Sequence, residues 1–255
     1  MYYADTGTGT PLVLIHGFPH DHTLWKPQLE GLGDGIRVIA PDLRGFGDST
    51  EVPERMTMDE YAADVKRIFD SLGIRQAVIG GLSMGGYVAL AFMARYPEAV
   101  RGLLLCNTRA GADDDKARTG RYDSIKKVEA EGVGALAEAM LPKMIAANTA
   151  TAHPDRRKAV REMMARQRPQ AVTAALRGLA ARPDRVPILP AIKVPTLIIT
   201  GSKDELIPVK ESEAMAAAIP GSRLVVIPDV AHLSNVEDPE AFNKEVKEFV
   251  GGLGA

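Results

Sequence analysis

Short apolar segments recur along the chain, and helical patterns separate most of them. The segments are too short for helices, and most are rich in valine and isoleucine and bounded by glycine, proline or polar residues. Such runs are typical of strands that are buried on both faces of a parallel sheet. The expected strands cover residues 12–16, 37–40, 77–80, 102–106, 196–200 and 224–227.

The intervening segments carry helix signals. Thr57 and Glu60 match a capping box, and apolar residues then recur at helical spacing until Gly73. Residues 87–95 and 242–250 are further helix candidates. This alternation predicts an α/β fold with a mostly parallel, doubly wound sheet, whose ligands bind at the C-terminal ends of the strands.

Residues 109–190 break the alternation, because they show helical patterns and no strand pattern. We expect helices over 122–131, 133–145, 155–168 and 170–181. The chain therefore divides into a core, residues 1–108 and 191–255, and a helical cap, residues 109–190, inserted between two strands. The methionines of the cap are expected to pack between helices, and Met140 and Met144 are also candidates for a substrate pocket.

Composition narrows the class of protein. The 255 residues are 45% hydrophobic and 25% charged, as in an ordinary globular protein. A net charge of −2 gives no basic field for nucleic acid. Cys106 is the only cysteine, which excludes a disulfide within the chain and argues against a cysteine-based zinc site. With neither a membrane-spanning run nor a signal-peptide pattern, we expect a cytoplasmic protein, and its oligomeric state stays open.

A candidate nucleophile lies in the Gly81-Leu82-Ser83-Met84-Gly85 segment, directly after the expected strand 77–80 and before a helical pattern. In this context G-x-S-x-G forms a strained turn that exposes the serine hydroxyl. The alternative is a glycine-rich turn with an incidental serine. The strand before it and the helix after it favour Ser83 as the nucleophile.

A serine hydroxyl needs a base to take its proton and an acid to orient that base. His232 follows the expected strand 224–227, so it should reach the same edge of the sheet as Ser83. Asp204 follows the strand 196–200 and is the preferred acid, with Glu205 and Asp229 as rivals. The chain order serine, aspartate, histidine is that of α/β-hydrolases.

The sequence resembles capped α/β-hydrolases, including carboxylesterases, 3-oxoadipate enol-lactonases and cofactor-free perhydrolases. Four separated motifs carry this resemblance: HGFP at 16–19, DLRGFGDS at 42–49, GLSMGG at 81–86, and Gly201 and Asp204 followed by His232. Family members usually have a further strand before the segment equivalent to residues 2–5, so the resemblance implies a sheet that lacks it. It also implies a reaction that needs no cofactor.

The resemblance gives the loop after the first expected strand a role. The backbone N–H of Phe18 would supply one half of an oxyanion hole, and that of Met84 the other half. Gly17 would let the backbone approach the substrate. His16 resembles a structural histidine that hydrogen-bonds within the loop.

Three other features each allow two interpretations. His20, Asp21 and His22 could bind a metal, but they lack the helical pairing of H-E-x-x-H, so we expect no metal. Trp25 is expected in the core, with pocket lining as the alternative. Arg109 follows the strand 102–106 and could bind a substrate carboxylate, although a salt bridge at the base of the cap is favoured.

We therefore expect a serine hydrolase that cleaves small to medium acyl esters through an acyl-enzyme, with a small-molecule ester or lactone as its partner. Lactonase and perhydrolase activities on the same triad are alternatives. Ser83 disfavours dehalogenases and epoxide hydrolases, which carry aspartate at the elbow. A C–C hydrolase or lyase has no supporting residue. The alternative from another class is a non-catalytic ligand-binding protein on the same fold.

Overall fold

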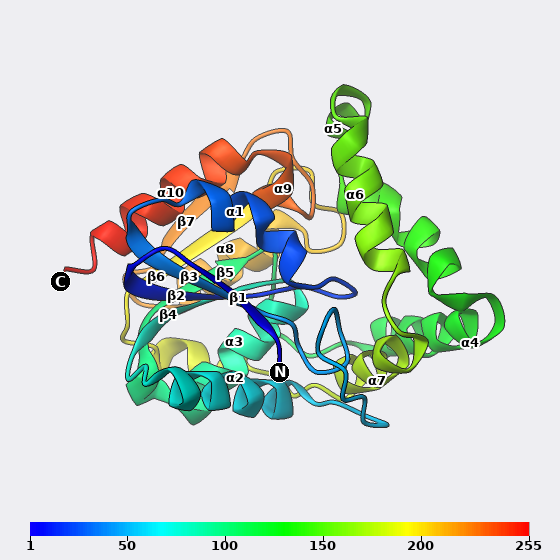
Figure 1. Ribbon diagram of the computed structural model, residues 1–255, viewed down its shortest axis with the longest axis horizontal. Helices are drawn as coiled ribbons and strands as arrows, with labels where there is room; N and C mark the ends of the chain where they lie inside the picture. Colours follow the sequence, from blue (N-terminus) through cyan, green and yellow to red (C-terminus); the bar gives the residue numbers. More distant parts are fainter. Residues whose placement is uncertain (255) are drawn as a thin grey trace.

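A seven-stranded sheet forms the centre of the computed structural model, which describes residues 1–254 (Figure 1). Its strand order is β1-β3-β2-β4-β5-β6-β7, with β1 antiparallel to β3 and the other pairs parallel. The strands are β1 (Tyr3–Thr6), β2 (Gly9–Ile15), β3 (Gly35–Pro41), β4 (Ala77–Leu82), β5 (Val100–Cys106), β6 (Thr196–Gly201) and β7 (Arg223–Ile227). Six of these coincide with the expected strands, so the mostly parallel sheet is confirmed.

Helices cover both faces of the sheet (Figure 1). One face carries α1 (Lys26–Gly31), α9 (Ser234–Glu237) and α10 (Pro239–Gly251). The other carries α2 (Met58–Leu72), α3 (Met84–Arg95) and α8 (Val209–Ala218). Short 3₁₀ turns occur at His22–Trp25, Pro97–Ala99 and Val186–Ala191. The doubly wound arrangement follows from strands that are apolar on both faces.

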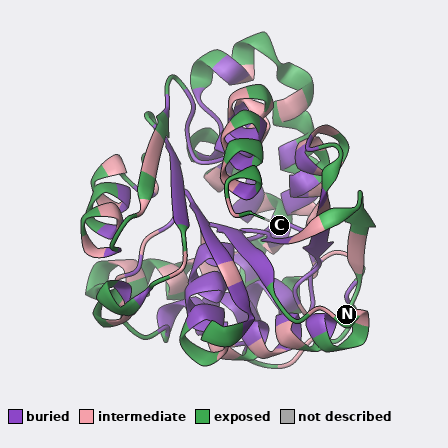
Figure 2. Cartoon of the chain, turned by 90° about the vertical axis from the view of Figure 1, so that its left-hand side faces the viewer, coloured by how far each residue is buried: buried purple, intermediate pink, exposed green. Residues whose placement is uncertain are grey.

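Two hydrophobic clusters lie on the two sides of the sheet. Val13 and Ile15 of β2 face the cluster that contains α2 and α3, whereas Leu12 and Leu14 face the cluster that contains α10. This alternation is the two-residue period of a strand. The central strands are accordingly buried throughout, as Figure 2 shows. The edge strand β7 differs: Val226 is 41% exposed, so the expectation of burial on both faces is wrong there.

The expected boundaries of α2 are confirmed. The Thr57 side chain accepts a hydrogen bond from the backbone N–H of Glu60, and the Glu60 carboxylate accepts one from the backbone N–H of Thr57. Gly73 ends the helix with a φ of 64°, a conformation that costs glycine little. Local sequence signals therefore determine both ends of this helix.

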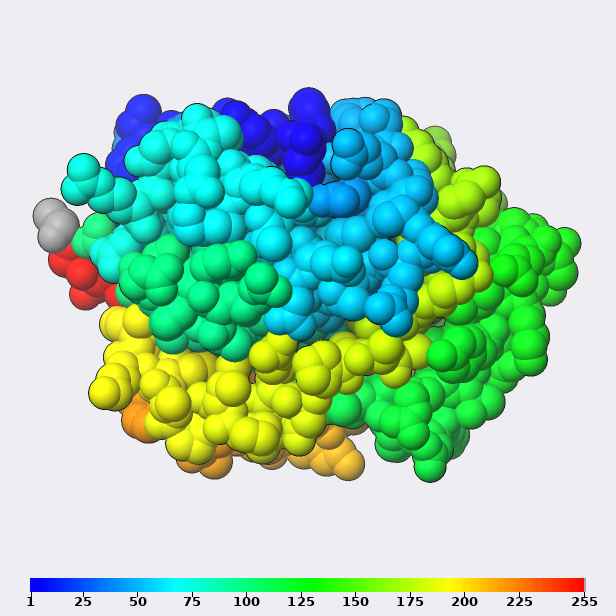
Figure 3. Space-filling view, turned by 90° about the horizontal axis from the view of Figure 1, so that it is seen from below, coloured from blue at the N-terminus to red at the C-terminus, as the bar shows by residue number. Residues whose placement is uncertain are grey.

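The helical insertion is α4 (Asp115–Met144), α5 (Ala147–Ala152), α6 (Pro154–Ala165) and α7 (Pro169–Ala180), between β5 and β6. Gly132 interrupts α4 with a φ of 81°, between the two helices expected at 122–131 and 133–145. The insertion forms a lobe at one end of the molecule (Figure 3). Among residues 1–254, we find no helix with the length and apolarity that crossing a bilayer requires.

Candidate active site

Ser83 lies in a strained turn between β4 and α3. Its φ of 54° and ψ of −114° are unfavourable for a residue with a side chain and cost about 1–3 kcal/mol. A Cβ on Gly81 would lie 2.1 Å from the carbonyl oxygen of Gly85, and one on Gly85 would lie 2.0 Å from that of Ile15. Both positions therefore require glycine, which agrees with the G-x-S-x-G interpretation.

His232 and Asp204 meet at the C-terminal edge of the sheet. His232 Nδ1 lies 2.8 Å from Asp204 Oδ2, and both side chains are almost fully buried. The other carboxylate oxygen accepts hydrogen bonds from the backbone N–H groups of Leu206 and Ile207. Burial alone would raise the pKa of Asp204, but the charge and hydrogen bond of His232 and the N–H group of Ile207 hold it below its ordinary value.

The rival acids lie elsewhere. Glu205 is exposed, and Asp229 is paired at the surface with Lys203, 2.7 Å from its Nζ. Neither is hydrogen-bonded to a histidine in the described part of the chain. The structure thus brings Asp204, and not its neighbours, to the imidazole.

Asn107, which is not among the expected site residues, also orients this pair. Its φ is 45°, and its Nδ2 donates to Asp204 Oδ2 over 2.9 Å and to the carbonyl oxygen of Ala231 over 3.2 Å. Its Oδ1 accepts from the hydroxyl of Ser234. Asn107 directly follows β5, so the strand-end rule that selected Asp204 could also have identified it.

Glu237 connects the histidine loop to the cap. Its carboxylate accepts hydrogen bonds from the backbone N–H of Ala231, next to His232, and from that of Ala146, just after α4. Both bonds are 2.8 Å long. Burial raises the pKa of Glu237 despite these donors. No sequence motif marks this residue, because its role depends on contacts across 91 positions.

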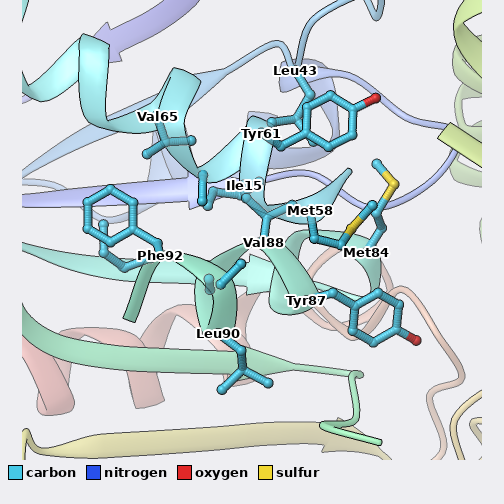
Figure 4. Packing of buried hydrophobic residues seen from close by; sticks show 14 of the residues in the cluster. Ile15, Leu43, Met58, Tyr61, Val65, Met84, Tyr87, Val88, Leu90 and Phe92 are labelled. Carbon is cyan, nitrogen blue, oxygen red and sulfur yellow. The ribbon is translucent and has the colours of Figure 1, made fainter. Parts of the chain in front are cut away.

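A pocket of about 220 Å³ holds Ser83 and His232. Core and cap both line it, and Figure 4 shows Met84 and Tyr87 at the end of α3 that lies away from Phe92. The lining residues are Phe18, Ser83, Met84, Tyr87, Arg109, Ala117, Arg121, Met140, Met144, Leu179, Leu206, Ile207 and His232. A larger hollow beside Tyr2 and Arg44 contains no histidine, so we place the site by its chemistry rather than by size.

The two expected oxyanion donors border this pocket. Phe18 lies in the loop after β2, and Met84 is the first residue of α3. Within residues 1–254, neither backbone N–H donates a hydrogen bond, since the loop leaves that of Phe18 free and the first N–H groups of a helix have no partner within it. Gly17 packs nearby, where a Cβ would lie 3.1 Å from the carbonyl oxygen of Leu82.

The other pocket candidates divide into two groups. Met140, Met144 and Arg109 line the pocket. Arg109 also donates to Asp113 at 2.7 Å, so it makes the salt bridge expected at the base of the cap. Trp25 is fully buried and packs against Phe242, with ring centroids 6.1 Å apart. Pocket lining by Trp25 is therefore wrong, because its indole fills the core below α10.

The histidines near the oxyanion loop have different structural roles. His16 lies with Nδ1 2.8 Å from the carbonyl oxygen of Gly17, and its Nε2 accepts from the backbone N–H of Leu43 over 3.0 Å. This pattern requires a neutral ring that donates from Nδ1. Burial accordingly lowers the pKa of His16. His16 joins the loops after β2 and β3, the structural role that the resemblance implies.

A second cluster, Asp21, His22 and Asp42, presents possible metal-ligand atoms within 4.8 Å of one another. Protein groups already occupy these atoms. His22 Nδ1 lies 2.9 Å from Asp42 Oδ1, and Asp21 accepts from both Arg166 and Gln167 of the cap. His20, which the metal-binding alternative grouped with Asp21 and His22, is not part of this cluster and is fully buried.

His20 makes stability depend on pH. Both its ring nitrogens are buried without a hydrogen-bond partner among the described residues. Burial lowers its pKa from 6.5 to about 3, so the native ring stays neutral where the unfolded chain binds a proton. The free energy of unfolding contributed by His20 should therefore fall as pH falls below about 6.5, by up to about 1.4 kcal/mol per pH unit.

Urea unfolding between about pH 5 and pH 7.5 measures this contribution. The slope of the free energy of unfolding against pH measures how many protons bind on unfolding. For His20→Asn this number should be smaller than for the parent protein by close to one. The exposed His153 provides the control, since His153→Asn should leave the slope unchanged. Equal slopes for His20→Asn and the parent would mean that His20 binds a proton equally well in the native and unfolded states, which contradicts the lowered pKa.

A family model, curated proteins and solved structures all match this chain over most of its length. The alpha/beta hydrolase fold family matches residues 10–239. A thermophilic esterase from Thermogutta terrifontis, solved with malate bound, is 44% identical, with a TM-score of 0.97 over 100% of this chain and 94% of that one. The enol-lactonase of Burkholderia xenovorans LB400 is 31% identical, with a TM-score of 0.91 over 98% and 96%. The 3-oxoadipate enol-lactonase 1 of Acinetobacter baylyi is 30% identical over 95% of this chain and 89% of its own.

Proposed function

Because the chain belongs to the α/β-hydrolase family, we propose that it is a serine hydrolase that cleaves small carboxylic esters through Ser83, His232 and Asp204. One observation carries the proposal. A strained, glycine-flanked serine shares a small pocket with a histidine whose other nitrogen is hydrogen-bonded to a buried carboxylate. This arrangement activates a hydroxyl for attack on an acyl carbon.

In the proposed reaction, Ser83 Oγ attacks the ester carbonyl and His232 Nε2 takes its proton. The negative charge that develops on the carbonyl oxygen is stabilised by the backbone N–H groups of Phe18 and Met84. Asp204 fixes the proton of the imidazole on Nδ1 and stabilises the imidazolium. His232 then protonates the leaving alcohol, and water activated by the same imidazole hydrolyses the acyl-enzyme. The reaction requires no cofactor.

Lactones are a second candidate substrate class, because a lactone is a cyclic ester and enol-lactonases are among the relatives. Perhydrolysis would use the same acyl-enzyme with peroxide in place of water. The pocket volume of about 220 Å³ lies below the range of about 300–1,000 Å³ that is usual for drug-sized ligands. The proposal is therefore restricted to small acyl groups.

A series of p-nitrophenyl esters of increasing acyl length, with several lactones beside it, tests this proposal. We expect kcat/KM to be highest for the shortest acyl chains and to fall steeply once the chain outgrows the pocket. A fluorophosphonate should label Ser83 while acetate esters are turned over repeatedly. One burst of product without turnover would instead identify a ligand-binding protein.

A further inference from the structure

Three arginines surround one carboxylate at the edge of the pocket. Asp113 is fully buried; its Oδ1 lies 2.7 Å from Arg109 Nη2 and 2.8 Å from Arg182 Nη2, and its Oδ2 lies 3.0 Å from Arg121 Nε. Burial alone would raise the pKa of Asp113, but the charges of the three guanidinium groups and their hydrogen bonds hold it below its ordinary value. Asp113 is therefore ionised, and the cluster carries an excess of positive charge.

Other carboxylates do not remove this excess. Glu211 acts on Arg109 electrostatically, without a hydrogen bond to it among the described residues. With Glu211 counted, the three arginines carry three positive charges, and Asp113 and Glu211 carry two negative ones. Arg182 is almost fully buried and stacks on the ring of Tyr87, 4.1 Å from its centroid. The remaining charge lies on Arg109 and Arg121.

Arg109 and Arg121 both line the pocket that contains Ser83 and His232, and none of the residues that line it is acidic. Their donors are only partly used. A guanidinium has five N–H donors, and within residues 1–254 each of these two donates one hydrogen bond, to Asp113. The Nε of Arg109 is buried without a hydrogen-bond partner. Asp113 fixes the position of both groups and leaves several donors for a ligand.

We propose that Arg109 and Arg121 form an anion subsite, and that the preferred substrates are esters or lactones that carry a second, free carboxylate. This inference rests on the proposed hydrolase function. Guanidinium groups bind carboxylates through paired, charge-assisted hydrogen bonds, which are stronger than neutral ones. In a small pocket this contact would orient the acyl carbon toward Ser83.

Two esters of matched chain length test the subsite: p-nitrophenyl pentanoate, which is neutral, and mono-p-nitrophenyl glutarate, which ends in a carboxylate. The measured quantity is the ratio of their kcat/KM values, anionic to neutral. We expect Arg121→Gln to lower this ratio by about 10- to 100-fold, the effect of losing a hydrogen bond to a charged group. Arg109→Gln should act in the same direction.

The matched control is Arg118→Gln, on the same helix α4. Arg118 pairs with Asp115, and its side chain is 48% exposed and does not line the pocket. Its one contact with Asp113 is a hydrogen bond of 3.4 Å to the backbone carbonyl oxygen, so its loss leaves the carboxylate and its three arginines in place. Its ratio should stay within about twofold of the parent value. Arg121→Lys, which keeps the charge but not the planar fork, should give an intermediate ratio. Thermal melts identify any variant that fails to fold. Asp113 keeps two arginines in each Arg109 or Arg121 variant and all three in Arg118→Gln.

Calorimetry with glutarate and the Ser83→Ala protein separates this inference from the hydrolase function. The comparison is between Ser83→Ala and the double variant that also carries Arg121→Gln. A Kd for glutarate that rises about 10-fold or more in the double variant supports the subsite even if no ester is hydrolysed. Unchanged ester ratios in folded Arg109 and Arg121 variants would overturn the subsite. Hydrolysis that still depends on Ser83 would leave the proposed function intact in that case.

Discussion

Replacing Ser83 with alanine should lower kcat for a short p-nitrophenyl ester by about 10⁵- to 10⁶-fold. The substitution removes only the hydroxyl oxygen that would attack the carbonyl. Alanine retains Cβ, so the backbone strain at φ 54° and the packing of Gly81 and Gly85 around it are unchanged. The residual rate should come from the pocket and the two N–H donors alone. Steady-state kinetics with an active-site titration of the parent protein gives the comparison.

Ser212 provides a matched control for this experiment. It is fully buried in α8, its hydroxyl has no hydrogen-bond partner among the described residues, and it does not line the pocket. Ser212→Ala should therefore leave kcat unchanged and leave stability the same or slightly higher. A Ser83→Ala protein that kept most of its esterase activity would show that another group is the nucleophile.

Much of the fold could be predicted because local signals agree with the final packing. The strands from β2 to β6 are apolar on both faces, and their sequence shows this directly. The ends of α2 are specified by Thr57, Glu60 and Gly73 within one segment. The expected break between two cap helices matches Gly132. In each case a short stretch of chain contains the physical reason for its own structure.

The contacts across the chain could not be predicted in the same way. Glu237 binds the backbone at Ala146, and Asp21 binds Arg166, over 145 positions. The residues next to each carboxylate in the sequence do not indicate which distant group it binds. The sequence around Arg121 does not show the three arginines that surround Asp113, because Arg109 and Arg182 come from other segments. The charge excess exists only once the two ends of the 109–190 segment, which carry Arg109 and Arg182, lie beside the helix that carries Arg121.

The nucleophile and the base were easier to predict than the groups that orient them. Ser83 is marked by glycines that its own turn requires, and His232 by its place after a strand. Asn107 has no such mark except its position after β5, yet it holds both Asp204 and the carbonyl of Ala231. Orientation depends on side chains whose polarity is ordinary and whose partners are distant.

Asp204→Asn should lower kcat by about 10⁴-fold, and the hydrogen bonds around the residue explain why. The N–H groups of Leu206 and Ile207 donate to Oδ1, so an asparagine would place its carbonyl oxygen there. Its NH₂ group would then occupy the position of Oδ2, facing His232 Nδ1 and the Nδ2 donor of Asn107. The imidazole would have to accept at Nδ1 and carry its proton on Nε2. In that tautomer it cannot take the proton of Ser83.

Asp229→Asn and Glu205→Gln are the matched controls, because both acids belong to the same sheet edge and are exposed. Each should retain kcat within about twofold of the parent, since surface charges contribute little to an orientation fixed by burial. The loss in Asp204→Asn should be smaller at alkaline pH, where hydroxide can replace the misoriented base. If kcat fell in Asp229→Asn and not in Asp204→Asn, Asp229 rather than Asp204 would be the acid that orients His232.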